Sequence, residues 1–213
     1  MRFFLLLVAL LFPQLLWAQF NEFYDGSYVL ANNPTTRYQT MLRIRDAHQI
    51  VVKQPDGKKT KLSPEQVSSF RIGRQKYIAV KGFTISGTWS DTQVKHAFVE
   101  QLDSGRVTLL RYENTVSSLM MIGANGGMSG GMASTQTIYF LRKAQDPTLY
   151  SISSNGWTGA GKQFREDLLP HLTSRPDLIK LVEGKTISVN ELPFIVRALN
   201  SGLAYRDLAT PTN

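Results

Sequence analysis

The stretch AFVEQLDSGRVTLLRY, residues 97–112, contains the clearest hairpin signal in this chain. Its two arms, 97–102 and 106–112, are rich in apolar residues and flank the short turn Asp103-Ser104-Gly105. Short arms of this kind on either side of a glycine-containing turn are typical of a β-hairpin. The turn Pro55-Asp56-Gly57 predicts a second hairpin, because glycine accepts the positive φ that such turns need.

Similar short apolar runs occupy most of the chain before residue 153. We predict further strands at 26–30, 41–45, 50–53, 59–62, 70–72, 77–80, 138–141 and 149–152. Within the second of these runs, Leu42 and Ile44 are expected to face inward. Arg43 and Arg45 alternate with them and are therefore expected to lie together on the solvent side.

After residue 155 the pattern becomes helical. The first helix is predicted at 162–169, and a second is expected to begin with Ser174 as its N-cap and to stop at Gly184. A capping box formed by Ser188 and Glu191 opens a third helix that ends near residue 202. Helices of about 10 residues are unstable alone, so they must pack on another part of the protein.

Strands followed by short helices indicate an α+β fold. We expect an antiparallel β-sheet module at 19–152, built as a small barrel or sandwich. Three short C-terminal helices in the segment 156–205 are expected to pack on it as one unit. The module contains a loop rich in glycine and methionine at 117–135, and residues 206–213 are expected to form a frayed tail.

The N-terminus has the layout of a secretory signal peptide. Arg2 supplies a positive charge, residues 3–16 are mostly apolar, and a small residue, Ala18, ends the segment. The apolar stretch is shorter than a membrane-spanning helix needs and contains Pro13, so we expect a signal peptide at 1–18 that is cleaved. The chain has no cysteine, which favours an exported bacterial protein over a small secreted eukaryotic one. We expect a periplasmic or extracellular location with no transmembrane helix after cleavage.

Positive charge is concentrated in one part of the chain. The whole sequence carries a formal net charge of +8, and residues 37–81 alone hold eleven Lys and Arg against three Asp and Glu. This basic β face predicts binding to an anionic partner: an envelope component such as lipid head groups or acidic polysaccharide, or an acidic protein surface. The candidate binding residues are Arg43, Arg45, Lys53, Lys58, Lys59 and Lys61. The alternative is a solvated sheet face whose cations only discourage edge-to-edge pairing.

Two motifs are incomplete matches to catalytic or nucleotide-binding loops. Residues 156–163 follow the P-loop pattern up to the lysine, but Gln163 stands where a hydroxyl must bind magnesium. Residues 127–131 fit the G-x-S-x-G form of a hydrolase nucleophile elbow, but no helix is predicted after Ser129, as that elbow requires. We therefore expect no catalytic residue and no cofactor, and no nucleic-acid motif is present.

The possible metal ligands are equally inconclusive. Four of the six methionines lie within the 117–135 loop, and thioethers are ligands for Cu(I). A mobile loop or a contact surface explains the same composition. The three histidines, His48, His96 and His171, have no ligand spacing, and each is expected at the surface or in a turn. We predict no metal site.

The order of several segments resembles a group of uncharacterised secreted proteins of Bacteroidetes. The segments are LLWAQ (15–19), KQPDGKK (53–59), LSPEQVSSF (62–70), FVEQLDSG (98–105), YFLRK (139–143), Phe164-x3-Leu168, PDL (176–178) and Ile195-Val-x3-Asn200. The resemblance implies export and a β-rich module with short C-terminal helices, and it supplies no activity. Many members carry a cysteine near the position of Arg175, which this chain lacks.

These observations together favour a non-catalytic binding or interaction module of the cell envelope. Two alternatives stay open at this point: a hydrolase that acts on envelope polymers, whose site the sequence does not identify, and a structural or adhesion accessory. The oligomeric state has no signal in the sequence.

Overall fold

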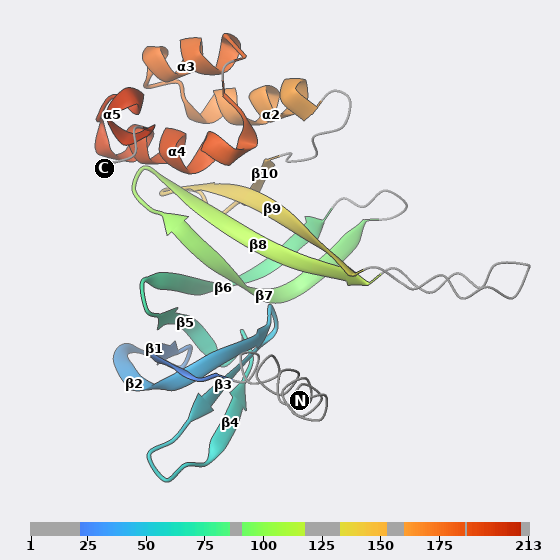
Figure 1. Ribbon diagram of the computed structural model, residues 1–213, viewed down its shortest axis with the longest axis vertical. Helices are drawn as coiled ribbons and strands as arrows, with labels where there is room; N and C mark the ends of the chain where they lie inside the picture. The colour runs from blue at the N-terminus through green and yellow to red at the C-terminus, as the bar shows by residue number, and fades with distance from the viewer. Residues whose placement is uncertain (1–21, 86–90, 118–132, 153–159, 186, 210–213) are drawn as a thin grey trace, which may run out of the picture. The chain divides into compact units, whose positions relative to one another are not determined.

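The computed structural model describes residues 22–85, 91–117, 133–152, 160–185 and 187–209. Within these ranges ten strands form one antiparallel sheet and short helices follow them in the chain, which confirms the α+β prediction (Figure 1). The strands are β1 (Tyr24–Leu30), β2 (Asn33–Asp46), β3 (Gln49–Lys53), β4 (Lys59–Leu62), β5 (Val67–Ile72), β6 (Gln75–Ile85), β7 (Thr92–Asp103), β8 (Val107–Ser117), β9 (Ala133–Lys143) and β10 (Tyr150–Ile152). Their hydrogen-bonded order is β10-β9-β8-β7-β6-β5-β1-β2-β3-β4.

The chain divides into two compact units, Met1–Ala79 and Val80–Asn213, and the division falls within β6. In the first unit β3 and β4 form the hairpin predicted from the Pro-Asp-Gly turn. Gly57 has a φ of +83°, and Asp56 accepts a hydrogen bond from the backbone N–H of Lys58 at 2.9 Å. The core of this unit includes Leu42, Ile50, Val52, Leu62, Val67 and Phe70.

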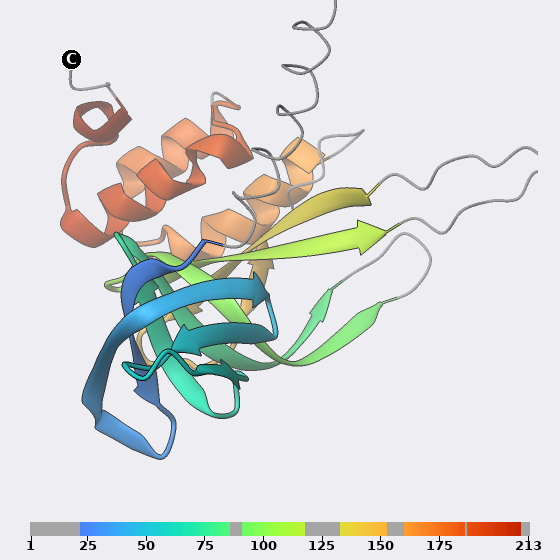
Figure 2. The ribbon, with the colours of Figure 1, turned by 60° about the horizontal axis from the view of Figure 1, so that its bottom comes forward.

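A bulge in β2, the long bent strand drawn in blue in Figure 2, alters the alternation expected for residues 41–45. Leu42 is fully buried, as predicted. The register shifts between Ile44 and Asp46, so Arg45 is the extra residue of the bulge. Ile44 points to the same face as Leu42, as predicted, but it is 38% exposed because it forms the last regular pair before the bulge.

In the second unit β7 and β8 pair as the hairpin predicted around residues 103–105, and β9 pairs with β8 and β10. Glu100 of β7 and Arg111 of β8 face each other across the hairpin, and Arg111 Nε donates a hydrogen bond to Glu100 Oε2 at 3.0 Å. Asn200 fastens this hairpin to a helix. Its side-chain amide donates to the Val107 carbonyl at 2.8 Å and to Asp103 at 2.9 Å, and its carbonyl accepts from the Val107 N–H at 3.0 Å.

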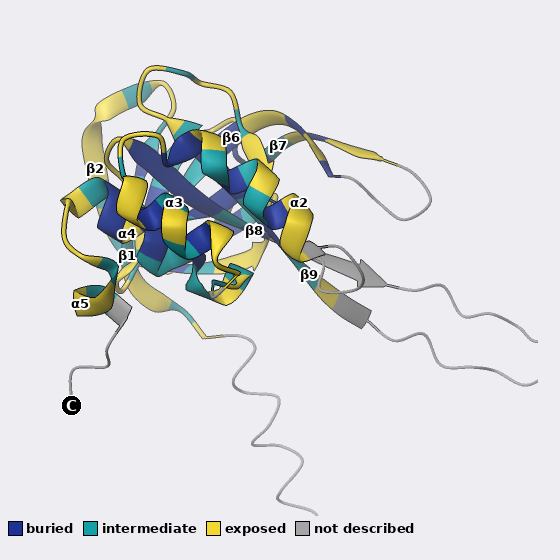
Figure 3. Cartoon of the chain, turned by 90° about the horizontal axis from the view of Figure 1, so that it is seen from above, coloured by how far each residue is buried: buried dark blue, intermediate teal, exposed yellow. Residues whose placement is uncertain are grey.

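The helices cover one face of β8, β9 and β10 within the second unit. They are α2 (Ala160–Leu168), the 3₁₀ turn η2 (Leu169–His171), α3 (Pro176–Glu183), the 3₁₀ turn η3 (Val189–Glu191), α4 (Leu192–Ser201) and α5 (Tyr205–Ala209). Figure 3 shows their buried residues in dark blue above the buried part of β8. The shared core contains Val107, Leu109, Leu141, Ile152, Phe164, Leu168, Leu172, Leu178, Val182, Leu192, Ile195, Val196, Ala198 and Leu199. No helix among the described residues is long and apolar enough to span a membrane, and the expected signal peptide at 1–18 lies outside these residues.

The helix boundaries agree with the sequence in one case and differ in another. The capping box is confirmed, since the Ser188 N–H donates to Glu191 Oε2 at 2.7 Å, and α4 ends at Gly202, whose φ is +77°. The prediction that Ser174 caps α3 is wrong, because the N-cap is Arg175. A proline disfavours the helical conformation in the residue before it, so Pro176 fixes the boundary at Arg175.

Candidate anion-binding face

The strand pairings of the first unit place its paired charged side chains on one face of the sheet. Residues that pair across antiparallel strands point to the same side of a sheet, so the pairings of β1 to β6 assign each paired residue to one face. One face carries seven cationic residues, which we call the basic face: Arg37, Arg43, Lys53, Lys59, Lys61, Arg71 and Lys76. Asp25 and Asp46 are the carboxylates at the paired positions of this face. The other face has no charged residue at any paired position of these strands.

Two cross-strand pairs on the basic face place like charges directly opposite each other. Lys53 of β3 pairs with Lys59 of β4, and Arg71 of β5 pairs with Lys76 of β6. Like charges directly opposite destabilise a sheet, whereas opposite charges stabilise it. The fold therefore carries an electrostatic cost on this face that a bound anion would relieve.

Apolar groups lie among these cations and hold some of them in place. Val51 pairs with Arg43 on one side and with Lys61 on the other, yet it is only 4% exposed. Long cationic side chains bury their alkyl stems along apolar surface while their charged ends stay in water, so cations and a buried valine are compatible at neighbouring positions. The Phe23 ring lies 5.2 Å from the Arg43 guanidinium carbon and 5.4 Å from Lys59 Nζ, so the ring sits between two cations of the face.

The other half of the basic face lies on β2, β5 and β6. Arg37 Nη1 donates to Ser27 Oγ at 3.2 Å, across the β1–β2 pair. Arg71 is exposed and has no ion-pair partner among the residues that the structure describes. The ammonium groups of Lys53 and Lys61 likewise have no carboxylate within ion-pair distance in the described part of the chain. These side chains are available for an external anion.

The structure places four of the six candidate residues on the basic face: Arg43, Lys53, Lys59 and Lys61. Arg45 lies in the bulge, where its guanidinium donates to Gln49 Oε1 at 2.9 Å. Lys58 lies in the turn between β3 and β4, outside the paired positions. The expectation that Arg43 and Arg45 share one regular face is therefore wrong, because the bulge inserts Arg45 as an unpaired residue.

Sequence reasoning missed three members of the face, Arg37, Arg71 and Lys76. Arg37 and Arg43 are six residues apart within β2, and residues an even number apart on a strand point to the same face. A predicted strand that extended back to residue 37 would have included Arg37 in the face. Arg71 and Lys76 needed the β1–β5 register, which joins strands far apart in the sequence. Local patterns do not specify such long-range pairing.

The motifs weighed for catalysis form no site among the described residues. The G-x-S-x-G segment at 127–131 lies outside them, as do residues 118–132 of the 117–135 loop and residues 156–159 of the P-loop-like segment. Gly161 and Lys162 belong to α2 itself, and β10 before it pairs antiparallel with β9, unlike a parallel βαβ unit. Within the described residues no group of three His, Cys, Asp or Glu side chains is placed to hold a metal ion.

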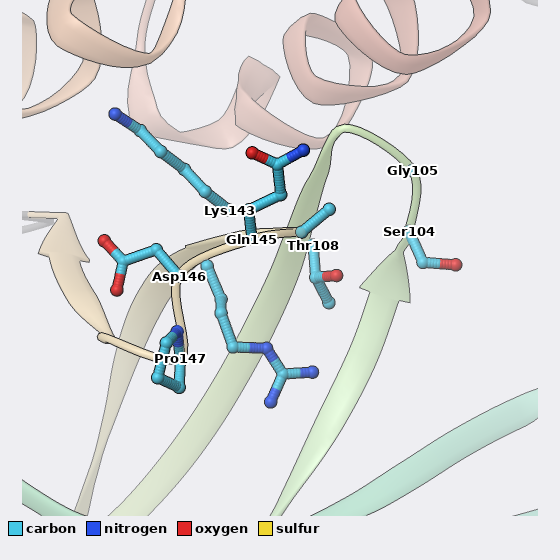
Figure 4. Close-up of a pocket in the computed structure, with 9 residues that line it drawn as sticks. Ser104, Gly105, Thr108, Lys143, Gln145, Asp146 and Pro147 are labelled. Carbon is cyan, nitrogen blue, oxygen red and sulfur yellow. The ribbon is translucent and has the colours of Figure 1, made fainter.

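A shallow depression of about 430 Å³ lies in the second unit between the β7–β8 turn and the β9–β10 loop (Figure 4). Its charged members include Lys143 and Asp146. Asp146 is occupied within its own loop, since it accepts hydrogen bonds from the Thr148 N–H at 2.9 Å and the Tyr150 hydroxyl at 2.7 Å. Hydrogen bonds from Thr148 and Tyr150 lower the pKa of Asp146 to about 2. The Asp146 carboxylate therefore stabilises the loop between β9 and β10.

His171 borders a neighbouring depression of about 520 Å³ and is 7% exposed, so the expectation of a surface or turn position is wrong for this histidine. Its ring packs edge-on against Tyr150, with ring centres 5.0 Å apart. Its Nδ1 has no hydrogen-bond partner among the described residues. Burial, followed by the nearby Lys143 charge, lowers the pKa of His171. No nucleophile or carboxylate hydrogen-bonds to this imidazole in the described part of the chain, so it does not form a catalytic pair.

No family model, curated protein or solved structure matches this chain.

Proposed function

We propose that this protein is an exported binding module of the bacterial cell envelope, and that the basic face binds an anionic partner. One observation carries the proposal: seven cations share one face of β1 to β6, and two pairs of them are directly opposed, while the other face has no charged residue at its paired positions. A face that served only solubility would be expected to intersperse both signs and to avoid opposed like charges. The expected signal peptide at 1–18 supports the envelope location.

The geometry favours contact over an extended surface. The cations come from β2 to β6 and present separate point charges spaced along these strands. Ammonium and guanidinium groups spread in this way attract a polyanion or an anionic surface through summed Coulomb interactions, which salt weakens.

The test compares two sets of charge-removing substitutions in the chain from residue 19 onwards, which contains every described residue. The face variant combines Lys53→Gln, Lys59→Gln, Lys61→Gln and Arg71→Gln. The control variant removes the same charge from exposed residues off the face, with Lys58→Gln, Arg74→Gln, Lys95→Gln and Lys180→Gln. Affinity for dextran sulfate is measured by isothermal titration calorimetry at low salt.

We expect the face variant to lose at least tenfold more affinity than the control variant, because only the face variant removes charges that point to one side of the sheet. Equal losses in the two variants would show that binding follows net charge alone and would refute the proposed site. Export is checked separately by sequencing the N-terminus of the protein recovered from its native host. Gln19 is expected as the first residue, and an intact Met1 would contradict the proposed cleavage.

A further inference from the structure

We infer that the partner of the basic face is the surface of an anionic lipid bilayer, an inference that rests on the proposed function and narrows it. The first observation is an exposed apolar side chain among the cations of the basic face. Met41 is 40% exposed and pairs with Lys53, which in turn pairs with Lys59. A purely charged polymer has no apolar surface for a methionine side chain to contact. The boundary between lipid head groups and acyl chains accommodates both the cations and the methionine.

The second observation is the aromatic ring beside this row. Phe23, the residue before β1, lies against both Arg43 and Lys59, so a further apolar group lies beside two of the cations. Cations that flank apolar side chains are the arrangement by which proteins lie on anionic membranes. The charges recruit the protein to the surface, and the apolar groups enter the interfacial layer.

The third observation concerns the shape of the site. The depressions of about 430 and 520 Å³ both lie in the second unit, and none of the residues that line them belongs to the basic face. On the face itself the cations are spaced along several strands, which suits a planar array of phosphate groups. Each Lys or Arg close to an anionic membrane contributes about fivefold in affinity, so four of them are expected to contribute on the order of several hundredfold.

The chain offers a matched pair of residues for the test. Met41 and Ile44 lie three residues apart on β2, are 40% and 38% exposed, and point to opposite faces of the sheet. Met41→Gln removes the apolar group from the basic face, and Ile44→Gln removes a similar group from the other face. Both variants are first shown to be folded by circular dichroism and thermal unfolding, so that a binding change is not a folding change.

Binding is measured by co-sedimentation with vesicles of phosphatidylcholine containing phosphatidylglycerol, with pure phosphatidylcholine vesicles as the neutral control and dextran sulfate as a polyanion without a bilayer. We expect binding to the anionic vesicles, none to the neutral ones, and loss of vesicle binding in high salt. Met41→Gln is expected to weaken vesicle binding about fivefold without changing dextran sulfate affinity, because burying the 40% of the Met41 side chain that is exposed contributes about this much. Ile44→Gln is expected to leave both unchanged.

The outcomes separate the two proposals. A protein that binds dextran sulfate but not anionic vesicles overturns the bilayer inference, leaves the proposed function standing, and points to an acidic polymer or protein. Equal weakening of both ligands by Met41→Gln also overturns it. A folded protein that binds neither ligand refutes both proposals.

Discussion

The opposed lysines on the basic face lead to an unusual prediction, in which a charge reversal stabilises the protein and impairs its binding. Lys53 and Lys59 face each other across the β3–β4 ladder, with the Lys53 ammonium lacking an ion-pair partner among the described residues. Lys53→Glu converts this like-charge pair into an opposite-charge pair. Lysine and glutamate are disfavoured in strands to a similar extent, so Lys53→Glu changes stability mainly through its charge.

The magnitude follows from the pairing. A directly opposed pair of charges contributes about 0.2–1 kcal/mol in either direction, so reversing its sign is expected to raise the free energy of unfolding by about 1 kcal/mol. For a chain of this length, that corresponds to a rise in Tm of about 2–4 °C. Lys58→Glu is the matched control, because Lys58 lies in the adjoining turn and has no partner in the ladder.

Urea unfolding followed by circular dichroism, at low and at high salt, measures the effect. Salt screens exposed charges, so the gain from Lys53→Glu is expected to shrink as the salt concentration rises. The same variant is expected to bind dextran sulfate more weakly than the wild type. If Lys53→Glu is no more stable than Lys58→Glu at low salt, the opposed lysines carry no cost and the electrostatic reasoning is refuted.

Three further predictions concern the second unit. Asn200→Ala removes the three hydrogen bonds to Val107 and Asp103 and is expected to lower the free energy of unfolding by about 2–3 kcal/mol in urea titrations; a loss no larger than that of exposed Asn190→Ala would contradict the fastening role. Arg175 donates to the Ala198 carbonyl and, at 2.9 Å, to the Leu203 carbonyl, so Arg175→Ala is expected to cost about 1.5–3 kcal/mol, and Arg175→Lys should restore less than half, since an ammonium cannot span the same acceptors. The pKa of His171 is lowered in the folded state, so the unfolded chain binds the His171 proton at higher pH than the folded protein does. The contribution of neutral His171 to the free energy of unfolding is therefore fully present above about pH 6.5 and is lost as the pH falls below that value. If a His171→Phe variant shows the same dependence of stability on pH between 7.5 and 5, His171 is not the group responsible.

Local sequence signals were sufficient for the elements whose ends are defined by one or two residues. Gly57 and Gly105 mark turns between strands that are adjacent in the sequence, so their hairpins were predictable from turn chemistry alone. The capping box at Ser188 and Glu191 was equally predictable, because both partners lie within one helical turn.

The basic face was only partly predictable because its completeness depends on long-range register. The pairing of β1 with β5 brings Arg71 and Lys76 to the side of the sheet that carries Arg43, across more than twenty intervening residues. The bulge at Arg45 acts in the opposite direction, since one inserted residue takes a predicted member out of the ladder. Serine is a favoured N-cap residue, so the local pattern points to Ser174, but Pro176 disfavours a helical conformation at Arg175 and places the boundary there.

A lysine footprint of the bound protein shows directly which cations contact the anion. Acetylation of each lysine in the chain from residue 19 onwards is followed by mass spectrometry, with and without saturating dextran sulfate. The account predicts that Lys53, Lys59, Lys61 and Lys76 become protected while Lys95, Lys180 and Lys185 react as before. Equal protection of both groups, or protection confined to the second group, would contradict binding through the basic face.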